Sequence, residues 1–169
     1  MKKLIFYKKN FCKLDQQIYP CAFGKGGIVL NKVEGDGATP IGTFPLRQVF
    51  YRPDRLKPPV TQLPVTALHR DMGWCDDVED PLYNQLVILP YSGRHEVLWR
   101  DDSVYDLILV VGYNDDPVVP GKGSAIFIHL AKENYPPTEG CLAFSFPDLE
   151  SILRELTPES EVVIDPNSV

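Results

Sequence analysis

His129 and Cys141 are the two residues whose types and spacing best suit nucleophilic catalysis. Cys141 directly follows Gly140 in HLAKENYPPTEGCLAF (129–144), and His129 ends the apolar run SAIFIHL. A cysteine attacks as a thiolate, so a neighbouring base or aligned backbone dipoles must lower its solution pKa of about 8.5. A histidine on a rigid strand can be that base, and amides at a turn preceded by glycine can bind an oxyanion. Spacing alone gives equal weight to a core cysteine beside a hydrogen-bonded strand histidine.

The remaining cysteines and histidines do not form a recognised metal or redox motif. The chain has four cysteines and three histidines, without a CxxC pair and without the short spacing that anchors most zinc sites. We therefore expect no metal site. Cys12 and Cys21 flank a predicted hairpin turn and could pair in an oxidising compartment, but two free thiols are the favoured interpretation.

Length and composition predict one globular domain that spans residues 1–169. The net charge of −6 argues against a nucleic-acid partner, because neutralising phosphates requires a concentrated basic surface. No apolar run reaches the length of a membrane span. The basic start of the sequence is followed by a short apolar run (4–7), which is too short for a signal-peptide core, so we expect no export signal here.

Runs rich in Ile, Val and aromatic residues predict a mainly β protein. With 16 prolines and 12 glycines there is little room for helix. One segment, 146–158, has a helical pattern, because Pro147 suits the first turn and Pro158 lies just beyond the end. The expected fold is a β-sandwich or barrel with one short helix after Cys141. The predicted strands are 4–9, 16–24, 26–32, 42–51, 85–91, 95–101, 105–113, 123–131 and 161–165.

Three motifs resemble those of the YkuD-like L,D-transpeptidase catalytic domain: GDGATPIGTF (35–44), GSAIFIHLA (123–131) and TEGC (138–141), with a short helix after the last. The resemblance implies a mainly β fold and a mechanism without a metal or an organic cofactor. Cys141 would attack the carbonyl between the third residue and the terminal D-alanine of a peptidoglycan stem peptide. D-Alanine would leave, and an amine of another stem or of a lipoprotein would resolve the thioester.

The same resemblance implies roles for the residues around the nucleophile. His129 would be the general base, and the amides of Gly140 and Cys141 would hold the oxyanion. Thr138 would brace the loop. The family usually has a histidine where this sequence has Glu139, and the spacer between His129 and Cys141 is shorter than usual. A negative Glu139 disfavours the thiolate unless it pairs with His129 or another cation, and it could help to recognise a positively charged acceptor amine.

The family also commonly has an arginine shortly after the cysteine, where this sequence continues Leu-Ala-Phe. Recognition of the stem-peptide carboxylate therefore needs another residue. Arg94 and Arg100 are candidates, because a guanidinium binds a carboxylate through two parallel hydrogen bonds. Further candidates for lining the cleft are His69, Trp74, His95 and Trp99.

Two other functions stay open at this level. Water in place of the acceptor amine would make the protein an L,D-carboxypeptidase or amidase, because both share the acyl-enzyme step. A non-catalytic peptidoglycan-binding module is the second alternative, and fast labelling of Cys141 at neutral pH is the expected mark that separates it from an enzyme. The implied partner is a peptidoglycan stem peptide, the implied location is the cell envelope, and a monomer is expected.

Overall fold

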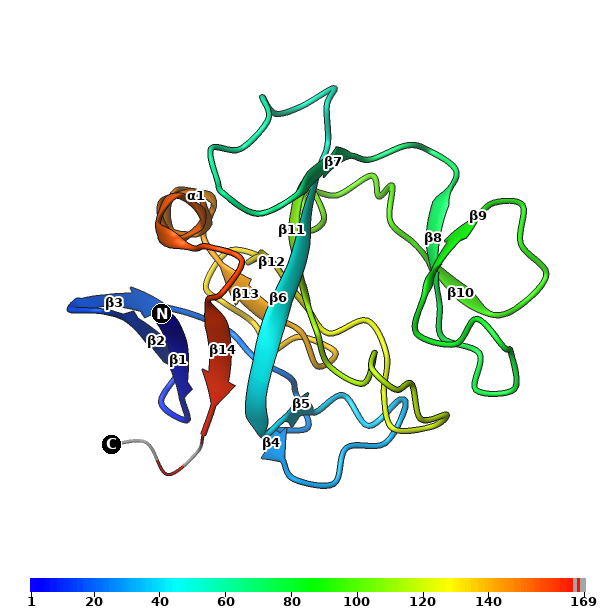
Figure 1. Cartoon of the computed structure of the whole chain (residues 1–169), viewed down its shortest axis with the longest axis horizontal. Helices are drawn as coiled ribbons and strands as arrows, with labels where there is room; N and C mark the ends of the chain where they lie inside the picture. Colours follow the sequence, from blue (N-terminus) through cyan, green and yellow to red (C-terminus); the bar gives the residue numbers. More distant parts are fainter. Residues whose placement is uncertain (166, 168–169) are drawn as a thin grey trace.

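The computed structural model describes residues 1–165 and 167, and it shows a large curved β-sheet, two smaller sheets and one helix (Figure 1). The strands are β1 (Lys3–Tyr7), β2 (Phe11–Leu14), β3 (Gln17–Pro20), β4 (Ile28–Val29), β5 (Thr39–Pro40), β6 (Gly42–Tyr51), β7 (Val65–Ala67), β8 (Met72–Cys75), β9 (Leu86–Ile88), β10 (His95–Val97), β11 (Leu107–Val111), β12 (Phe127–Leu130), β13 (Leu142–Phe144) and β14 (Glu161–Ile164). The helix is α1 (Phe146–Glu155). Within this part of the chain, no helix has the length and apolar character needed to cross a membrane.

The large sheet is nearly closed into a barrel. Its strand order is β13-β12-β11-β6-β14-β1-β2-β3, with β7 also paired to β6. The segment after β3 returns to the opposite edge, where Ala22 and Ala143 exchange two backbone hydrogen bonds of 2.9 Å. This bridge covers the β13 edge and places residues 22–25 beside the loop that contains Cys141. The small sheet β10-β8-β9 lies to one side of the barrel (Figure 1).

Two hydrophobic cores lie on opposite faces of β11 and β12. Because successive side chains of a strand point to opposite faces, Leu109 and Ile128 belong to the core inside the barrel, whereas Ile108 and Phe127 belong to a second core. This second core also contains residues of β8 and Cys141. Burial on both faces explains why the sequence of β11, LILVV, is apolar without alternation.

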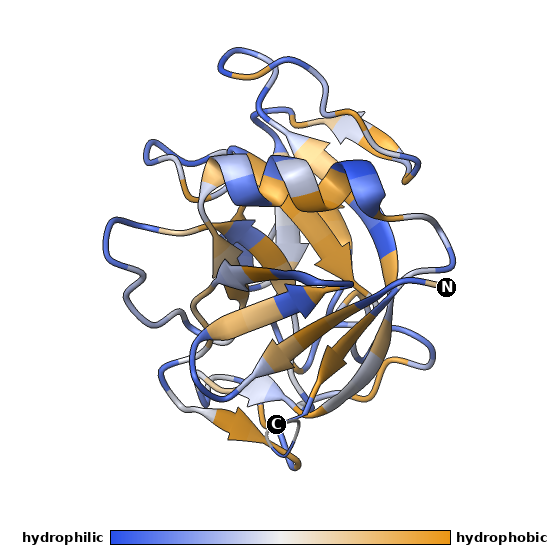
Figure 2. Cartoon of the chain, turned by 90° about the vertical axis from the view of Figure 1, so that its left-hand side faces the viewer, coloured by the Kyte–Doolittle hydropathy of each residue, from blue (hydrophilic) through white to orange (hydrophobic). Residues whose placement is uncertain are grey.

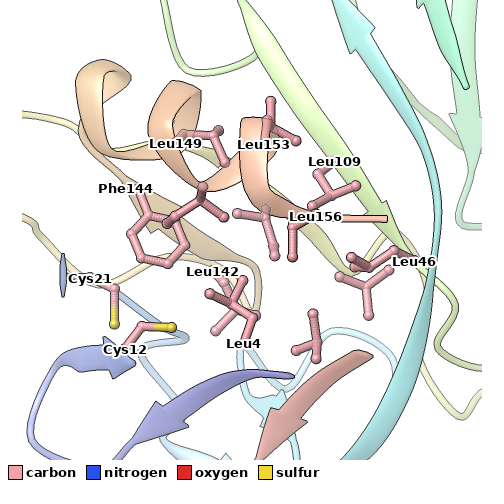
Figure 3. Close-up of a cluster of buried hydrophobic side chains, with 14 of the residues drawn as sticks. Leu4, Cys12, Cys21, Leu46, Leu109, Leu142, Phe144, Leu149, Leu153 and Leu156 are labelled. Atoms are coloured by element: carbon pink, nitrogen blue, oxygen red, sulfur yellow. The ribbon is translucent and has the colours of Figure 1, made fainter. Parts of the chain in front are cut away.

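Helix α1 covers the interior core of the barrel. Ser145 caps its N-terminus by accepting a hydrogen bond from the Asp148 amide at 3.3 Å. Figure 2 shows the helix lying across the strands, with hydrophilic and hydrophobic stretches alternating along its turns. Figure 3 shows its leucines pointing into the core, where burial of each contributes about 1.5–3 kcal/mol. The buried residues of this face are Leu149, Ile152, Leu153 and Leu156.

The predicted mainly β fold with one helix after Cys141 is confirmed. The predicted strand 42–51 matches β6 residue for residue, whereas the predicted helix 146–158 ends three residues early, at Glu155. The predicted strand 26–32 shrinks to the two residues of β4, because Gly27 has a φ of 79° and turns the chain. Strands β2, β5, β7, β8 and β13, each of two to four residues, were not predicted.

Cys12 and Cys21 are free thiols inside the barrel, in agreement with the favoured interpretation (Figure 3). Cys12 lies on β2 and Cys21 follows β3. Burial raises the pKa of the Cys21 thiol to about 12, so it stays protonated at neutral pH.

Candidate active site

A pocket of about 260 Å³ has both His129 and Cys141 in its wall. His129 lies on β12, and Cys141 immediately precedes β13, which is the parallel neighbour of β12. The register pairs His129 with Ala143 on the neighbouring strand. Cys141 comes two residues before Ala143, so it lies one strand away from the histidine. Strand pairing therefore brings together two residues that the sequence separates by a loop with two prolines.

The TEGC loop packs against the GDGATP segment. Thr39 is fully buried, and its Oγ1 accepts a hydrogen bond from the Gly24 amide and donates one to the Gly140 carbonyl, both at 2.8 Å. Gly140 has a φ of 129°, and a Cβ atom there would lie 2.8 Å from the Ala38 carbonyl oxygen. Only glycine tolerates both conditions. The GDGATP segment thus fixes the backbone that carries Cys141.

We expect Thr39→Val to lower the free energy of unfolding by about 1–3 kcal/mol, because it leaves a buried amide and a buried carbonyl without their partner. Thr39→Ser keeps the hydroxyl and should retain most of the stability. Urea unfolding of the two variants measures the difference. Equal stability of both variants would show that the hydroxyl does not hold the loop.

Lys32 places a positive charge behind the same turn. Its side chain is buried, and its Nζ donates to Asp36 Oδ1 at 2.7 Å. The Nζ lies 3.6 Å from the position that a Cβ of Gly140 would take. Asp36 also accepts hydrogen bonds from the Val33 and Ala38 amides, which holds the lysine in place.

The thiol of Cys141 is buried and protonated in the free protein. It donates to the Ala125 carbonyl at 3.2 Å and accepts a hydrogen bond from the Phe127 amide at 3.5 Å. Burial raises the pKa of the Cys141 thiol to about 12, and the charge of Glu96 acts in the same direction. The Phe127 amide and Lys32 oppose this rise in pKa without cancelling it.

His129 is a neutral base in the same pocket. Its Nδ1 lies 3.0 Å from the Leu130 carbonyl oxygen. A carbonyl only accepts, so Nδ1 carries the hydrogen and Nε2 keeps a lone pair that can take a proton. Burial lowers the pKa of His129 to about 4. The ring of Tyr105 packs against the imidazole with 5.4 Å between centroids, which further fixes its orientation.

The Cys141 amide is a free hydrogen-bond donor at the turn in the part of the chain that the structure describes. Thr138 Oγ1 accepts a hydrogen bond from the Gly140 amide at 3.1 Å and donates one to the Cys141 carbonyl. The Gly140 amide is therefore occupied in this conformation. Across residues 1–165 and 167, the Cys141 amide has no hydrogen-bond acceptor. The family resemblance implied that the amides of Gly140 and Cys141 bind the oxyanion. Of these two, the Cys141 amide is free to do so.

The fold agrees with the comparison to known families. The family model for the L,D-transpeptidase catalytic domain (YkuD) matches residues 3–164. The chain belongs to this family. Two similar solved structures are the helical cell shape determining protein Pgp2 from Campylobacter jejuni and a point mutant of it, each 15% identical with a TM-score of 0.48. Each comparison covers 99% of this chain and 48% of the other, so this chain spans about half the length of Pgp2. A comparison with curated proteins found no match.

Glu139, which stands where the YkuD family usually has histidine, is directed toward solvent. Its carboxylate pairs with Lys25 at 2.8 Å, and 80% of its side chain is exposed. This pairing with another cation was one of the two arrangements expected for it. Exposure and pairing weaken its effect on the Cys141 thiol, because water and the lysine screen the charge.

Arg100 is the only one of the six candidate substrate-binding residues that lines the pocket. Asp102 holds its guanidinium through Nε at 2.8 Å and Nη2 at 2.6 Å. Arg94 instead pairs with Asp76 at 3.1 Å, outside the residues that line this pocket. Arg100 therefore remains the candidate for binding the stem-peptide carboxylate, since no arginine follows Cys141 closely in the sequence.

The other four candidates lie away from the pocket. Trp74 is buried in the second core, and His69 is exposed. The Nδ1 of His95 lies 2.7 Å from the carbonyl oxygen two residues before it. Trp99 stacks under the guanidinium of Arg52 at 3.8 Å. These contacts give Trp74, His95 and Trp99 structural roles.

Four residues of the site were not identified from the sequence: Lys32, Glu96, Tyr105 and Lys132. Its position just before GDGATP is the one local feature of the sequence that could have indicated Lys32 as a site residue. Glu96 and Tyr105 line the pocket, and the Tyr105 hydroxyl donates a hydrogen bond to Glu96. They come from the far side of the second core, so no local pattern connects them to Cys141.

Proposed function

We propose that the chain is a cysteine-dependent acyl transferase that acts on peptidoglycan stem peptides, with Cys141 as the nucleophile and His129 as the general base. The observation that supports this most is that one pocket of a YkuD-family domain contains both the thiol and a histidine whose Nε2 is free to accept a proton.

The reaction starts from a neutral thiol and a neutral imidazole. As Cys141 Sγ bonds to the peptide carbonyl carbon, its proton passes to His129 Nε2, and the oxyanion accepts a hydrogen bond from the Cys141 amide. The imidazolium then protonates the departing amine, and a thioester remains. An acceptor amine attacks the thioester, loses a proton to Nε2, and the thiol is restored.

Arg100 is suited to bind the terminal carboxylate of the donor peptide. Asp102 binds Nε and Nη2 of its guanidinium, and Nη1 is not part of that pair. Lys132 contributes a second positive charge to the same wall. The two cations place the donor's terminal residue beyond the carbonyl that Cys141 attacks.

Intact-mass measurement after incubation with a carbapenem tests the nucleophile, because such a β-lactam imitates the acyl donor. We expect a stable adduct on the wild type and none on Cys141→Ala. An adduct that persists on a folded Cys141→Ala variant would assign the nucleophile elsewhere.

A stem tetrapeptide, with and without an added acceptor amine, tests the reaction. A transferase gives the amide of the acceptor, and a carboxypeptidase gives only the shortened peptide. If the folded wild type binds the peptide without any product, the chain is a binding module and the proposal fails.

A further inference from the structure

Glu96 places a carboxyl group in the wall of the pocket that contains Cys141. It lies on β10, directly opposite Trp74 of β8, and the Tyr105 hydroxyl donates a hydrogen bond to its Oε1. In the described part of the chain Glu96 makes no ion pair, because the nearby Arg100 is held by Asp102.

This carboxyl group opposes the reaction in the free protein. Burial raises the pKa of Glu96, so its own ionisation is unfavourable, and its negative charge helps to raise the pKa of the Cys141 thiol. A half-buried carboxylate that raises the pKa of the nucleophilic thiol slows catalysis unless a ligand changes its environment.

The other charged groups around the pocket do not remove this cost. Those that act on Cys141, Glu96 or His129 are Lys32, Glu34, Asp76, Arg100, Asp102, Tyr105 and Lys132. Lys32 is bound to Asp36. Arg100 lowers the pKa of Glu96 but is bound to Asp102, and the pKa of Glu96 is still raised. Lys132 acts on His129 and not on Glu96.

We propose that Glu96 binds a primary ammonium group of the substrate, and that the resulting ion pair favours ionisation of Cys141. This inference rests on the proposed acyl transfer and names its substrate class, which is an acyl donor with a free amine near the attacked carbonyl. Glu96 and Arg100 together give the pocket one anionic and one cationic group, which suits the two charges of an amino acid. A substrate without the amine reacts more slowly, because the thiol then ionises less readily.

Two tetrapeptide donors that differ only by acetylation of the side-chain amine of a lysine at the third residue test this inference. We expect the wild type to release the terminal residue about tenfold faster from the free-amine peptide, since a charge-assisted contact is lost on acetylation. In Glu96→Gln, which can still accept the Tyr105 hydrogen bond, the preference should disappear. Glu133→Gln, an exposed glutamate outside the pocket, should keep the preference.

The outcomes separate this inference from the proposed function. If the wild type turns over both peptides equally, or if Glu96→Gln keeps the preference, the ammonium site is wrong while the acyl transfer stands. If neither peptide reacts and a carbapenem also leaves Cys141 unmodified, the proposed function fails and this inference fails with it.

Discussion

Replacement of His129 by glutamine should slow the acylation of Cys141 by about 10²–10⁴-fold, which is the usual contribution of a positioned general base. The thiol is protonated in the free protein, so attack requires an acceptor for its proton, and Nε2 of His129 has a lone pair that can take it. Intact-mass spectrometry of samples quenched at successive times after addition of a carbapenem gives the acylation rate. His69→Gln, an exposed histidine outside the pocket, should react like the wild type.

The same base predicts the pH dependence of the reaction. His129 must be neutral to accept a proton, and burial lowers its pKa to about 4. For the acetylated tetrapeptide, which has no ammonium group for Glu96 to bind, the value of kcat/KM should therefore stay level as the pH falls from 7 to 5 and then decline through about 4. A solvated histidine would give a decline near about 6.5 instead. A decline between 6 and 7 would show that His129 is hydrated in the reacting protein.

Cys141 should react slowly with iodoacetamide in the free protein, although it is the proposed nucleophile. With a pKa of about 12, only about one thiol in 10⁵ is ionised at pH 7, against about 3% for a cysteine with a pKa of about 8.5. We therefore expect alkylation about 10³-fold slower than that of a free cysteine, rising about tenfold with each pH unit. Peptide mapping over time measures it.

This prediction replaces the expectation of fast labelling that followed from the sequence. A nucleophile on the surface would label quickly, whereas burial keeps the Cys141 thiol protonated in the free protein. Protein unfolded in urea should label at Cys141 at the rate of a free cysteine. Fast labelling of the folded protein at pH 7 would contradict the buried, neutral thiol.

Much of the fold followed from local patterns in the sequence. The ten-residue strand β6 and the helix after Cys141 were predictable because each is long and has its own periodicity or capping signal. Short strands such as β8 and β13 were not, since three or four residues carry little pattern and depend on their neighbours for hydrogen bonds.

The sequence by itself determined the mainly β class, the helix and the pair His129 and Cys141, because residue type, glycine and strand end are local properties. Only the tertiary structure decided the protonation of that pair, because burial sets the pKa of both groups. It also decided which arginine reaches the pocket and brought Glu96 to it. The positions of Arg100 and Glu96 depend on how strands distant in sequence pack around one pocket. No local sequence pattern predicts that packing.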